Sequence, residues 1–367
     1  MVVSRRTFIH RAGAAALAAG LTRLQAAQPA MGVPEHLEQN PGEIWIDALS
    51  GYRVDDEGFA EIERSGLAML SITLGPAGTP TFTYEAAVRD LAAWHGIFAK
   101  YRDELVHVRR AEDILQAKRE GKFAVMLNLQ NATHLNRDIR NVDFFYNLGI
   151  RQIQLTYNEL NALGAGCTER VDSGLSDFGV EVVHRMNELG MLIDLSHCGV
   201  QTTLDAIEFS KKPVIFSHTN CRALNDNMRC KTDEQIKKLV AKGGVMGIST
   251  VNFFVSTKPR STLDDYIAHI EHVVKLVGID HIGIGSDSSI GGWRQSYPNE
   301  KAFWDFHGQF KFKPGADVRW PPFIEEIDVP EKYYVIKRRL AERGFSPADT
   351  AKILGGNFLR IYREILV

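Results

Sequence analysis

The chain has 367 residues, of which 44% are hydrophobic and 24% are charged, as expected for a globular protein with a large core. The formal net charge of −2 gives no overall field that favours binding to nucleic acid. No hydrophobic run is long enough to cross a bilayer as a helix of the mature protein. We therefore expect neither nucleic acid as a partner nor a transmembrane span.

Residues 1–30 differ from the rest of the chain. The pair Arg5-Arg6 precedes Phe8, a mildly hydrophobic stretch covers residues 12–21, and small residues follow up to Ala30. This order is that of a signal peptide, and the arginine pair resembles a twin-arginine export signal. A disordered basic tail is the alternative. Export predicts that the mature protein begins near residues 28–31 and works in a bacterial periplasm.

Hydrophobic runs in the first half of the chain predict β-strands. They cover residues 44–49, 67–74, 106–108, 123–129 and 150–155. Hydrophobic residues at helical spacing predict helices over 84–101 and 111–119. A further helix is predicted over 176–189, with Ser176 as its N-cap and Gly190 as its C-cap.

The stretch 191–218 contains two hydrophobic runs that each end in Ser-His. The first run leads to His197 and the second to His218, and a segment with helical spacing separates them. A strand, a helix and a strand in this order require a parallel strand pair. The carboxyl ends of parallel strands meet at one rim, so both histidines are predicted to lie there.

Strand and helix patterns alternate through most of the chain. Helices are predicted over 232–241, 263–277, 346–354 and 357–365, and strands over 244–250 and 281–285. About eight strands without a linker favour an α/β fold, a single (β/α)8 (TIM) barrel over residues 31–367. A doubly wound open sheet is the alternative, because periodicity does not separate the two.

The segment 290–330 interrupts the alternation and holds three of the five tryptophans. It follows the last strand, so we expect it to cover the carboxyl rim as a lid or binding loop. A hydrophobic cluster packed on the barrel wall is the alternative.

Polar residues at strand ends are the candidates for chemistry. His197, His218 and Asp287 are such residues, and two imidazoles with a carboxylate are good ligands for zinc. Three protein ligands leave one position for a water molecule that can attack a carbonyl. Cys198 and Cys221, close in sequence to the histidines, are predicted to be buried thiols, a disulfide or further metal ligands.

Several runs, in this order, carry a resemblance to a known family. They are 166–179 with 182–198, Leu-Thr-Tyr-Asn at 155–158, Phe-Ser-His at 216–218, Ile-Gly-Ile-Gly-Ser-Asp at 282–287 and Ile-Leu-Gly-Gly-Asn-Phe-Leu-Arg at 353–360. The chain resembles the membrane dipeptidase (renal dipeptidase) family, peptidase family M19. The resemblance implies a barrel of the metal-dependent hydrolase (amidohydrolase) type, a dinuclear zinc site that hydrolyses dipeptides, and a homodimer.

The resemblance also implies roles for single residues. His197 and His218 match the histidine ligands of the second zinc. Asp287 matches the aspartate that handles the proton at the scissile nitrogen. Arg229 matches the arginine that pairs with the substrate carboxylate, which a guanidinium can hold through two hydrogen bonds. Taken alone, Arg229 is equally compatible with a solvated loop arginine.

The chain departs from the family at the remaining metal ligands. Leu49 and Gly51 stand where the first strand of the family carries the His-x-Asp pair of the first zinc. Gln130 stands for the bridging glutamate, and a neutral amide bridges two cations poorly. Tyr157 stands for a histidine over the substrate carbonyl, and its hydroxyl still donates to an oxyanion.

Three functions remain open. The first is a zinc-dependent, dipeptidase-like hydrolase that cleaves an amide bond beside a free carboxylate in a small peptide-like substrate. It would bind one zinc ion at His197 and His218, with Gln130 or Asp287 completing the ligand set. The second is a tautomerase, a lyase or a maturation enzyme for a peptide-like metabolite, with Asp287 as acid and base. The third is a binding protein without catalysis.

Overall fold

The computed structural model describes residues 42–75, 83–307 and 317–367. All of them belong to one unit, Gln39–Val367. The export signal predicted over residues 1–30 lies outside the described residues. Within the described ranges, no helix has both the length and the hydrophobicity that a membrane crossing needs.

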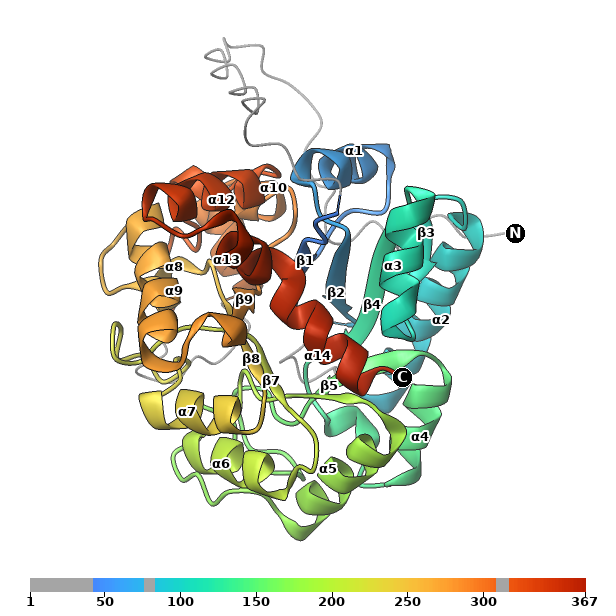
Figure 1. The fold of residues 1–367 in the computed structure, drawn as a ribbon. Coiled ribbons are helices and arrows are strands. Elements are labelled where there is room, and N and C mark those ends of the chain that lie inside the picture. The colour runs from blue at the N-terminus through green and yellow to red at the C-terminus, as the bar shows by residue number, and fades with distance from the viewer. Residues whose placement is uncertain (1–41, 76–82, 308–316) are drawn as a thin grey trace. The chain divides into compact units, whose positions relative to one another are not determined.

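Eight parallel strands form the wall of a barrel (Figure 1). In sheet order they are β1 (Ile46–Asp47), β2 (Met69–Thr73), β4 (Phe123–Leu129), β5 (Ile150–Gln154), β6 (Leu192–Asp194), β7 (Ile215–Thr219), β8 (Val245–Ile248) and β9 (Ile282–Ile284). The amide of Ala48, just after β1, donates to the carbonyl of Ile284 in β9 at 3.0 Å, which joins the last strand to the first. The predicted (β/α)8 barrel is confirmed, and the open sheet is excluded.

One predicted strand lies outside this wall. β3 (Leu105–His107) pairs with Phe123–Val125 at the start of β4, whereas β5 pairs with β4 from Leu127 onward. The two strands therefore share one edge of β4, and only β5 continues the barrel. Sequence alone gives no sign of this difference, because both segments are hydrophobic runs with an ordinary strand pattern.

Helices cover the outside of the barrel. The predicted helices are confirmed as α2 (Tyr84–Lys100), α3 (Ala111–Glu120), α5 (Asp177–Leu189), α6 (Val200–Phe209), α7 (Asp233–Ala241) and α9 (Leu263–Val277). Ser176 caps α5 by accepting from the amide of Gly179, as predicted, and Gly190 ends it in the left-handed conformation. Thr232 and Gln235 form the capping box of α7.

Several helices were not predicted from the sequence, among them α1 (Asp56–Ser65), α4 (Arg140–Asn147) and α12 (Lys332–Glu342). α1 does carry a start signal, because the Asp55 side chain accepts from the amide of Gly58. α4 begins after Ile139, which offers no side-chain cap, so no local signal marks its start. Short helices of this kind are stabilised mainly by packing, which a single sequence shows poorly.

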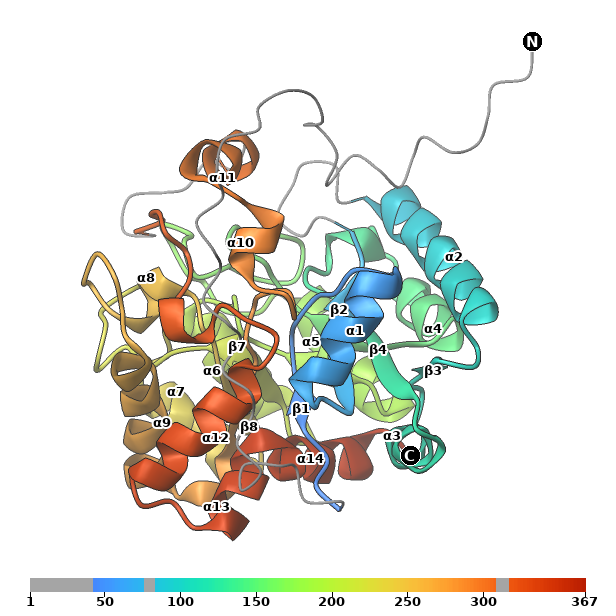
Figure 2. The same cartoon turned by 90° about the horizontal axis from the view of Figure 1, so that it is seen from above.

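α14 (Asn357–Ile365) closes the amino-terminal end of the barrel. Its side chains Phe358, Ile361 and Tyr362 are buried in one hydrophobic cluster with residues from the starts of several strands. α14 lies across the ring of strands in Figure 1, and α10 (Trp293–Ser296) and α11 (Glu300–His307) lie at the opposite end in Figure 2. The amino-terminal end is therefore filled with hydrophobic side chains, and a site for polar chemistry lies at the carboxyl rim.

The predicted helix over 346–354 is shorter than expected. α13 covers Pro347–Ala351, and a π-helical turn, which is wider than an α-helical one, covers Lys352–Gly356 and leads into α14. Gly355 in this turn lies against the backbone before β1, where a Cβ atom would come within 2.1 Å of the carbonyl oxygen of Ile44. The wider turn thus lets the chain pass closely under β1.

Candidate active site

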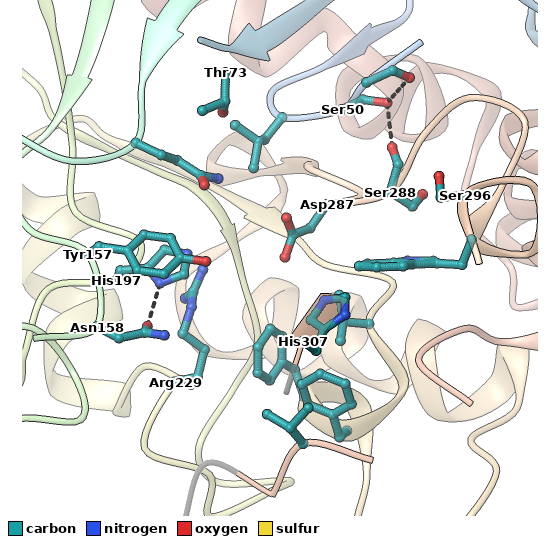
Figure 3. A pocket seen from close by; sticks show the side chains of 18 of the residues that line it. Ser50, Thr73, Tyr157, Asn158, His197, Arg229, Asp287, Ser288, Ser296 and His307 are labelled. Carbon is teal, nitrogen blue, oxygen red and sulfur yellow. Dashed lines mark hydrogen bonds between the residues drawn. The ribbon is translucent and has the colours of Figure 1, made fainter. Parts of the chain in front are cut away.

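A cavity of about 340 Å³ opens at the carboxyl ends of the strands (Figure 3). It is lined by five of the six predicted site residues, Gln130, Tyr157, His197, Arg229 and Asp287. The sixth, His218, is fully buried directly behind His197 and Gln130. The structure therefore brings all six residues together.

The two histidines approach each other through the same ring atom. β6 leads into His197 and the neighbouring β7 contains His218, and their Nε2 atoms lie 3.0 Å apart. The strand that carries His218 also packs closely on Gly285, just after β9, where a Cβ atom would lie 1.7 Å from the carbonyl oxygen of Ser217. Glycine at position 285, part of the Ile-Gly-Ile-Gly-Ser-Asp run, is thus required beside the histidine strand.

Hydrogen bonds at the other ring nitrogen fix the tautomer of each histidine. Nδ1 of His197 lies 2.7 Å from Oδ1 of Asn158, which also accepts from the Cys167 thiol at 3.5 Å. Nδ1 of His218 lies 2.7 Å from Oγ of Ser217. Each Nδ1 therefore carries the proton, and each Nε2 presents a lone pair. Burial, more than any other cause, keeps the pKa of both histidines well below the ordinary value, so both rings are neutral.

Asp194 lies behind this arrangement. Its buried carboxylate accepts hydrogen bonds from the amides and hydroxyls of both Ser196 and Ser217, and from the Gln152 side chain. Because the Ser217 hydroxyl donates to Asp194, its oxygen is left to accept from Nδ1 of His218. Asp194 thus acts through Ser217 as a positioning residue for His218.

We expect Asp194→Asn to reverse the tautomer of His218. The variant replaces an acceptor oxygen with an NH₂ group, so Ser217 turns its proton toward Nδ1 and the imidazole proton moves to Nε2. Zinc affinity should fall about 10–100-fold, the usual cost of losing such a partner. The 15N shifts of His218 in zinc-free protein give the tautomer directly.

Asp205→Asn is the control. Asp205 lies on the outer helix α6, so this variant should change neither the His218 tautomer nor the zinc affinity. An unchanged His218 tautomer in Asp194→Asn would refute the assigned role.

The residues present fit one zinc ion and not two. Two lone pairs that face each other at 3.0 Å form no hydrogen bond, and a cation between them removes the conflict. Zinc with Zn–N bonds near 2.0–2.1 Å in tetrahedral geometry places two nitrogens about 3.3 Å apart, a small widening of this pair. Nε2 of Gln130 lies 3.2 Å from Nε2 of His218. Rotating the Gln130 amide by about 180° exchanges its nitrogen and oxygen, so the oxygen would face the zinc position as a third ligand.

Among the described residues, the place where the resemblance implies a first zinc ion holds no ligand set. Leu49, Ser50 and Gly51 line the cavity there. Asp47, two positions earlier, is buried and accepts from Tyr333 and from the amides of Leu49 and Ser286. Within the described part of the chain, no group of three His, Cys, Asp or Glu side chains is placed to hold a metal. Any single-metal site here therefore depends on the amide of Gln130 or on water.

Asp287 stands in the middle of the pocket view, with the Tyr157 hydroxyl pointing into the same space (Figure 3). Its backbone is left-handed, with φ of 58°, and its amide donates to the carbonyl of Leu49. This uncommon conformation for a non-glycine residue aims the carboxyl group into the cavity. Burial raises the pKa of Asp287 to about 7, against the opposing charge of Arg229. A carboxyl group with this pKa exchanges protons near neutral pH.

Arg229 is buried and is held from two sides. Its guanidinium donates to the carbonyl of Ser196 at 2.6 Å and to that of His218 at 2.8 Å, and it packs over the Phe254 ring. The solvated loop arginine is therefore excluded. Arg229 also lines the cavity, and Nε has no partner among the described residues. It ties together the two segments that carry the histidines and places a fixed positive charge in the site.

Tyr157 stacks on His197, with ring centroids 4.1 Å apart. Burial raises the pKa of Tyr157 far above the ordinary value, so its hydroxyl keeps its proton and remains a donor.

Of the three alternatives predicted for the cysteines, the buried thiol is the one observed. Cys198 and Cys221 are free and buried, and neither lines the cavity. Asn158, Asp194 and Ser217 were not predicted as site residues, although Asn158 stands in the quoted Leu-Thr-Tyr-Asn run.

The described part of the segment 290–330 reaches the rim of the cavity. Trp293, Tyr297 and His307 line the cavity, and whether the segment binds a ligand stays a prediction. Phe303 packs against Trp320, which in turn packs against Phe323, as a hydrophobic cluster would. Residues 308–316 of the segment lie outside the described residues.

Comparisons with known proteins agree with the barrel fold and with the resemblance drawn from the sequence. A family model described as membrane dipeptidase (peptidase family M19) matches residues 60–298. An uncharacterised dipeptidase of Schizosaccharomyces pombe is 34% identical over 217 residues, 57% of this chain and 52% of the relative. Dipeptidase tcpJ of Claviceps purpurea is 26% identical over 355 residues, 89% of this chain and 77% of the relative. The match therefore spans about half the length of the first relative.

Solved structures support the fold. A crystal structure of an amidohydrolase from Pseudomonas aeruginosa has a TM-score of 0.78 and 31% identity, covering 89% of this chain and 97% of the other. The probable dipeptidase PvdM from Pseudomonas aeruginosa has a TM-score of 0.74 and 20% identity, covering 89% and 96%. At the lower identity, the likeness concerns the fold alone.

Proposed function

The chain belongs to the membrane dipeptidase family, peptidase family M19, and from this premise we propose that it is a hydrolase that cleaves an amide bond next to a free carboxylate with one zinc ion. The observation that carries the proposal is the pair of neutral histidines whose Nε2 lone pairs face each other at 3.0 Å beside Asp287. Their fixed tautomers are those that metal binding requires.

His197 and His218 would hold the zinc ion, with Gln130 as a weak third ligand. Bound there, zinc supplies Lewis acidity that activates a water molecule and polarises a carbonyl group. Gln130 brings no charge, so this site compensates less of the metal charge than one with a carboxylate ligand.

The protein's own groups supply the remaining steps. Asp287 takes a proton from the attacking water and gives it to the scissile nitrogen, a task that suits a carboxyl group with a pKa near 7. The Tyr157 hydroxyl donates to the oxygen on which negative charge develops. Arg229 attracts the substrate carboxylate from its fixed position between the two histidine segments.

The test of the function is turnover of amide substrates that carry a free carboxylate, before and after a strong chelator removes the metal. We expect loss of activity with the chelator and recovery with added zinc. Activity that resists the chelator but disappears in Asp287→Asn would favour the non-hydrolytic enzyme instead, and binding without turnover would favour the binding protein.

We also propose that residues 1–30 direct export to a bacterial periplasm. The support is the Arg5-Arg6 pair before Phe8 and the stretch 12–21. Replacing both arginines with lysine should retain the protein in the cytoplasmic fraction of a bacterial host, whereas the unchanged leader should yield shortened protein in the periplasmic fraction. Equal distribution of the two forms would contradict export by this route.

A further inference from the structure

The charges around the cavity are few. Among its described lining residues, Asp287 is the only carboxylate and Arg229 the only permanent cation. The neighbouring polar groups are neutral hydroxyls and amides: Ser50, Thr73, Gln130, Asn158, Thr168, Ser288, Ser289 and Ser296. The site thus offers one partner for a negative group and at most one for a positive group.

Carboxylates behind the lining are already satisfied. Asp47 accepts from Tyr333 and two amides, and the buried Lys332 lies in its field. Asp194 accepts from two serines and Gln152, and the buried Lys231 lies in its field. Each deeper carboxylate therefore has hydrogen-bond partners and a buried lysine nearby, and neither lines the cavity where it could pair directly with a bound cation.

Asp287 is a poor partner for an ammonium group. In the proposed reaction, it must take up and release a proton, and an ammonium paired to it would oppose protonation. Arg229 and a bound zinc ion would repel the same ammonium from a short distance. A free amino terminus, which every dipeptide carries, would therefore find no carboxylate left to pair with it among the described lining residues.

One wall of the cavity is hydrophobic and aromatic. Phe253 and Phe254 from α8 (Asn252–Val255) line it together with Trp293, Tyr297 and His307 from the 290–330 segment. Trp293 stacks on Tyr297 with centroids 5.7 Å apart, and Tyr297 meets His307 edge to face at 5.1 Å. Such a wall accommodates an aromatic ring or a large hydrophobic group.

We propose that the substrate is an N-acylated amino acid, with an uncharged aromatic or hydrophobic acyl group against this wall and a free carboxylate near Arg229. The inference rests on the proposed hydrolase function and names its substrate class. Water adds to the acyl carbonyl carbon, the C–N bond breaks, and the nitrogen takes up a proton. The products are a carboxylic acid and a free amino acid.

A matched pair of compounds tests the inference. 3-Phenylpropanoyl-alanine and phenylalanyl-alanine differ only in the ammonium group, which the first lacks. With alanine of either configuration, we expect kcat/KM at pH 7 to favour the first compound by about tenfold or more, because only the second must bury an unpaired cation. An equal or higher kcat/KM for phenylalanyl-alanine would overturn the inference.

Thr73→Glu sharpens the test because it adds a carboxylate at the cavity wall on a residue outside the proposed zinc ligands. Relative to 3-phenylpropanoyl-alanine, phenylalanyl-alanine should gain in kcat/KM and in affinity, so the preference for the uncharged compound should narrow. Gln116→Glu adds the same charge on the exposed face of α3 and should leave this preference unchanged. An unaltered preference in Thr73→Glu would contradict the electrostatic cause.

Binding separates this inference from the proposed function. If neither compound is hydrolysed, the hydrolase proposal fails, yet titration calorimetry still compares their dissociation constants. Tighter binding of 3-phenylpropanoyl-alanine, by about tenfold, would support the assigned ligand class. Equal binding, or tighter binding of phenylalanyl-alanine, would overturn it whatever the turnover.

Discussion

His197→Ala is expected to abolish hydrolysis and zinc binding together. The substitution removes one of two imidazole nitrogens that face each other at 3.0 Å, and the Gln130 amide with His218 is too weak a set to retain the ion. We expect kcat/KM to fall by about a thousandfold or more, since the chemical step depends on the metal. Elemental analysis and a hydrolysis assay on the same preparation measure both effects.

His184→Ala is the matched control for this prediction. His184 lies on α5, half-buried and outside the cavity lining, so its loss removes an imidazole of the same size without touching the site. Zinc content and turnover should stay at the level of the unchanged protein. Full activity in His197→Ala would exclude that residue from the chemistry, and loss of both properties in His184→Ala would point to general unfolding.

Asp287→Asn is expected to lower hydrolysis by roughly 10²–10⁴-fold while substrate binding and zinc content persist. The amide keeps the size of the side chain but neither accepts a proton from water nor gives one to the scissile nitrogen. The signature is therefore a fall in kcat with little change in the dissociation constant of a substrate. Retained kcat would assign the proton transfer to another group.

The same substitution should stabilise the zinc-free fold at higher pH. The pKa of Asp287 is about 7 in the folded chain, mainly because of burial, and about 4 in the unfolded chain. The folded state thus binds the proton more tightly, and stability is lost as pH rises from about 4 to about 7. Asparagine does not titrate, so the Asp287→Asn variant does not lose this stability as pH rises. The melting temperature of the variant minus that of the unchanged protein should therefore be larger at pH 8 than at pH 5. An equal difference at both pH values would contradict the raised pKa.

The sequence predicted the barrel and the location of the site because both depend on local patterns. Two Ser-His pairs after hydrophobic runs, separated by a helix, leave the histidines on one rim in any parallel arrangement. The ends of α9 were predicted correctly because Thr262 caps its first turn and Gly278 follows its last. The strand over 106–108 was predicted correctly, but nothing in its sequence shows that β3 pairs only with the start of β4 and stays outside the barrel wall.

The supporting contacts of the site were beyond sequence reasoning. Asp194 looks like an ordinary polar residue near a strand end, and its role appears only when Ser196 and Ser217 from neighbouring strands meet at its carboxylate. Arg229 was predicted as a substrate ligand, and its two bonds to backbone carbonyls depend on loop positions that no motif specifies. The homodimer and the export signal remain predictions.

The zinc content of the purified protein tests the central claim most directly. Two neutral imidazoles have facing lone pairs, and no described residue supplies a ligand where the family's first zinc binds. These two observations predict one zinc ion per chain in an active preparation. Full hydrolytic activity in a preparation that contains no metal, or that requires two zinc ions per chain, would contradict the account.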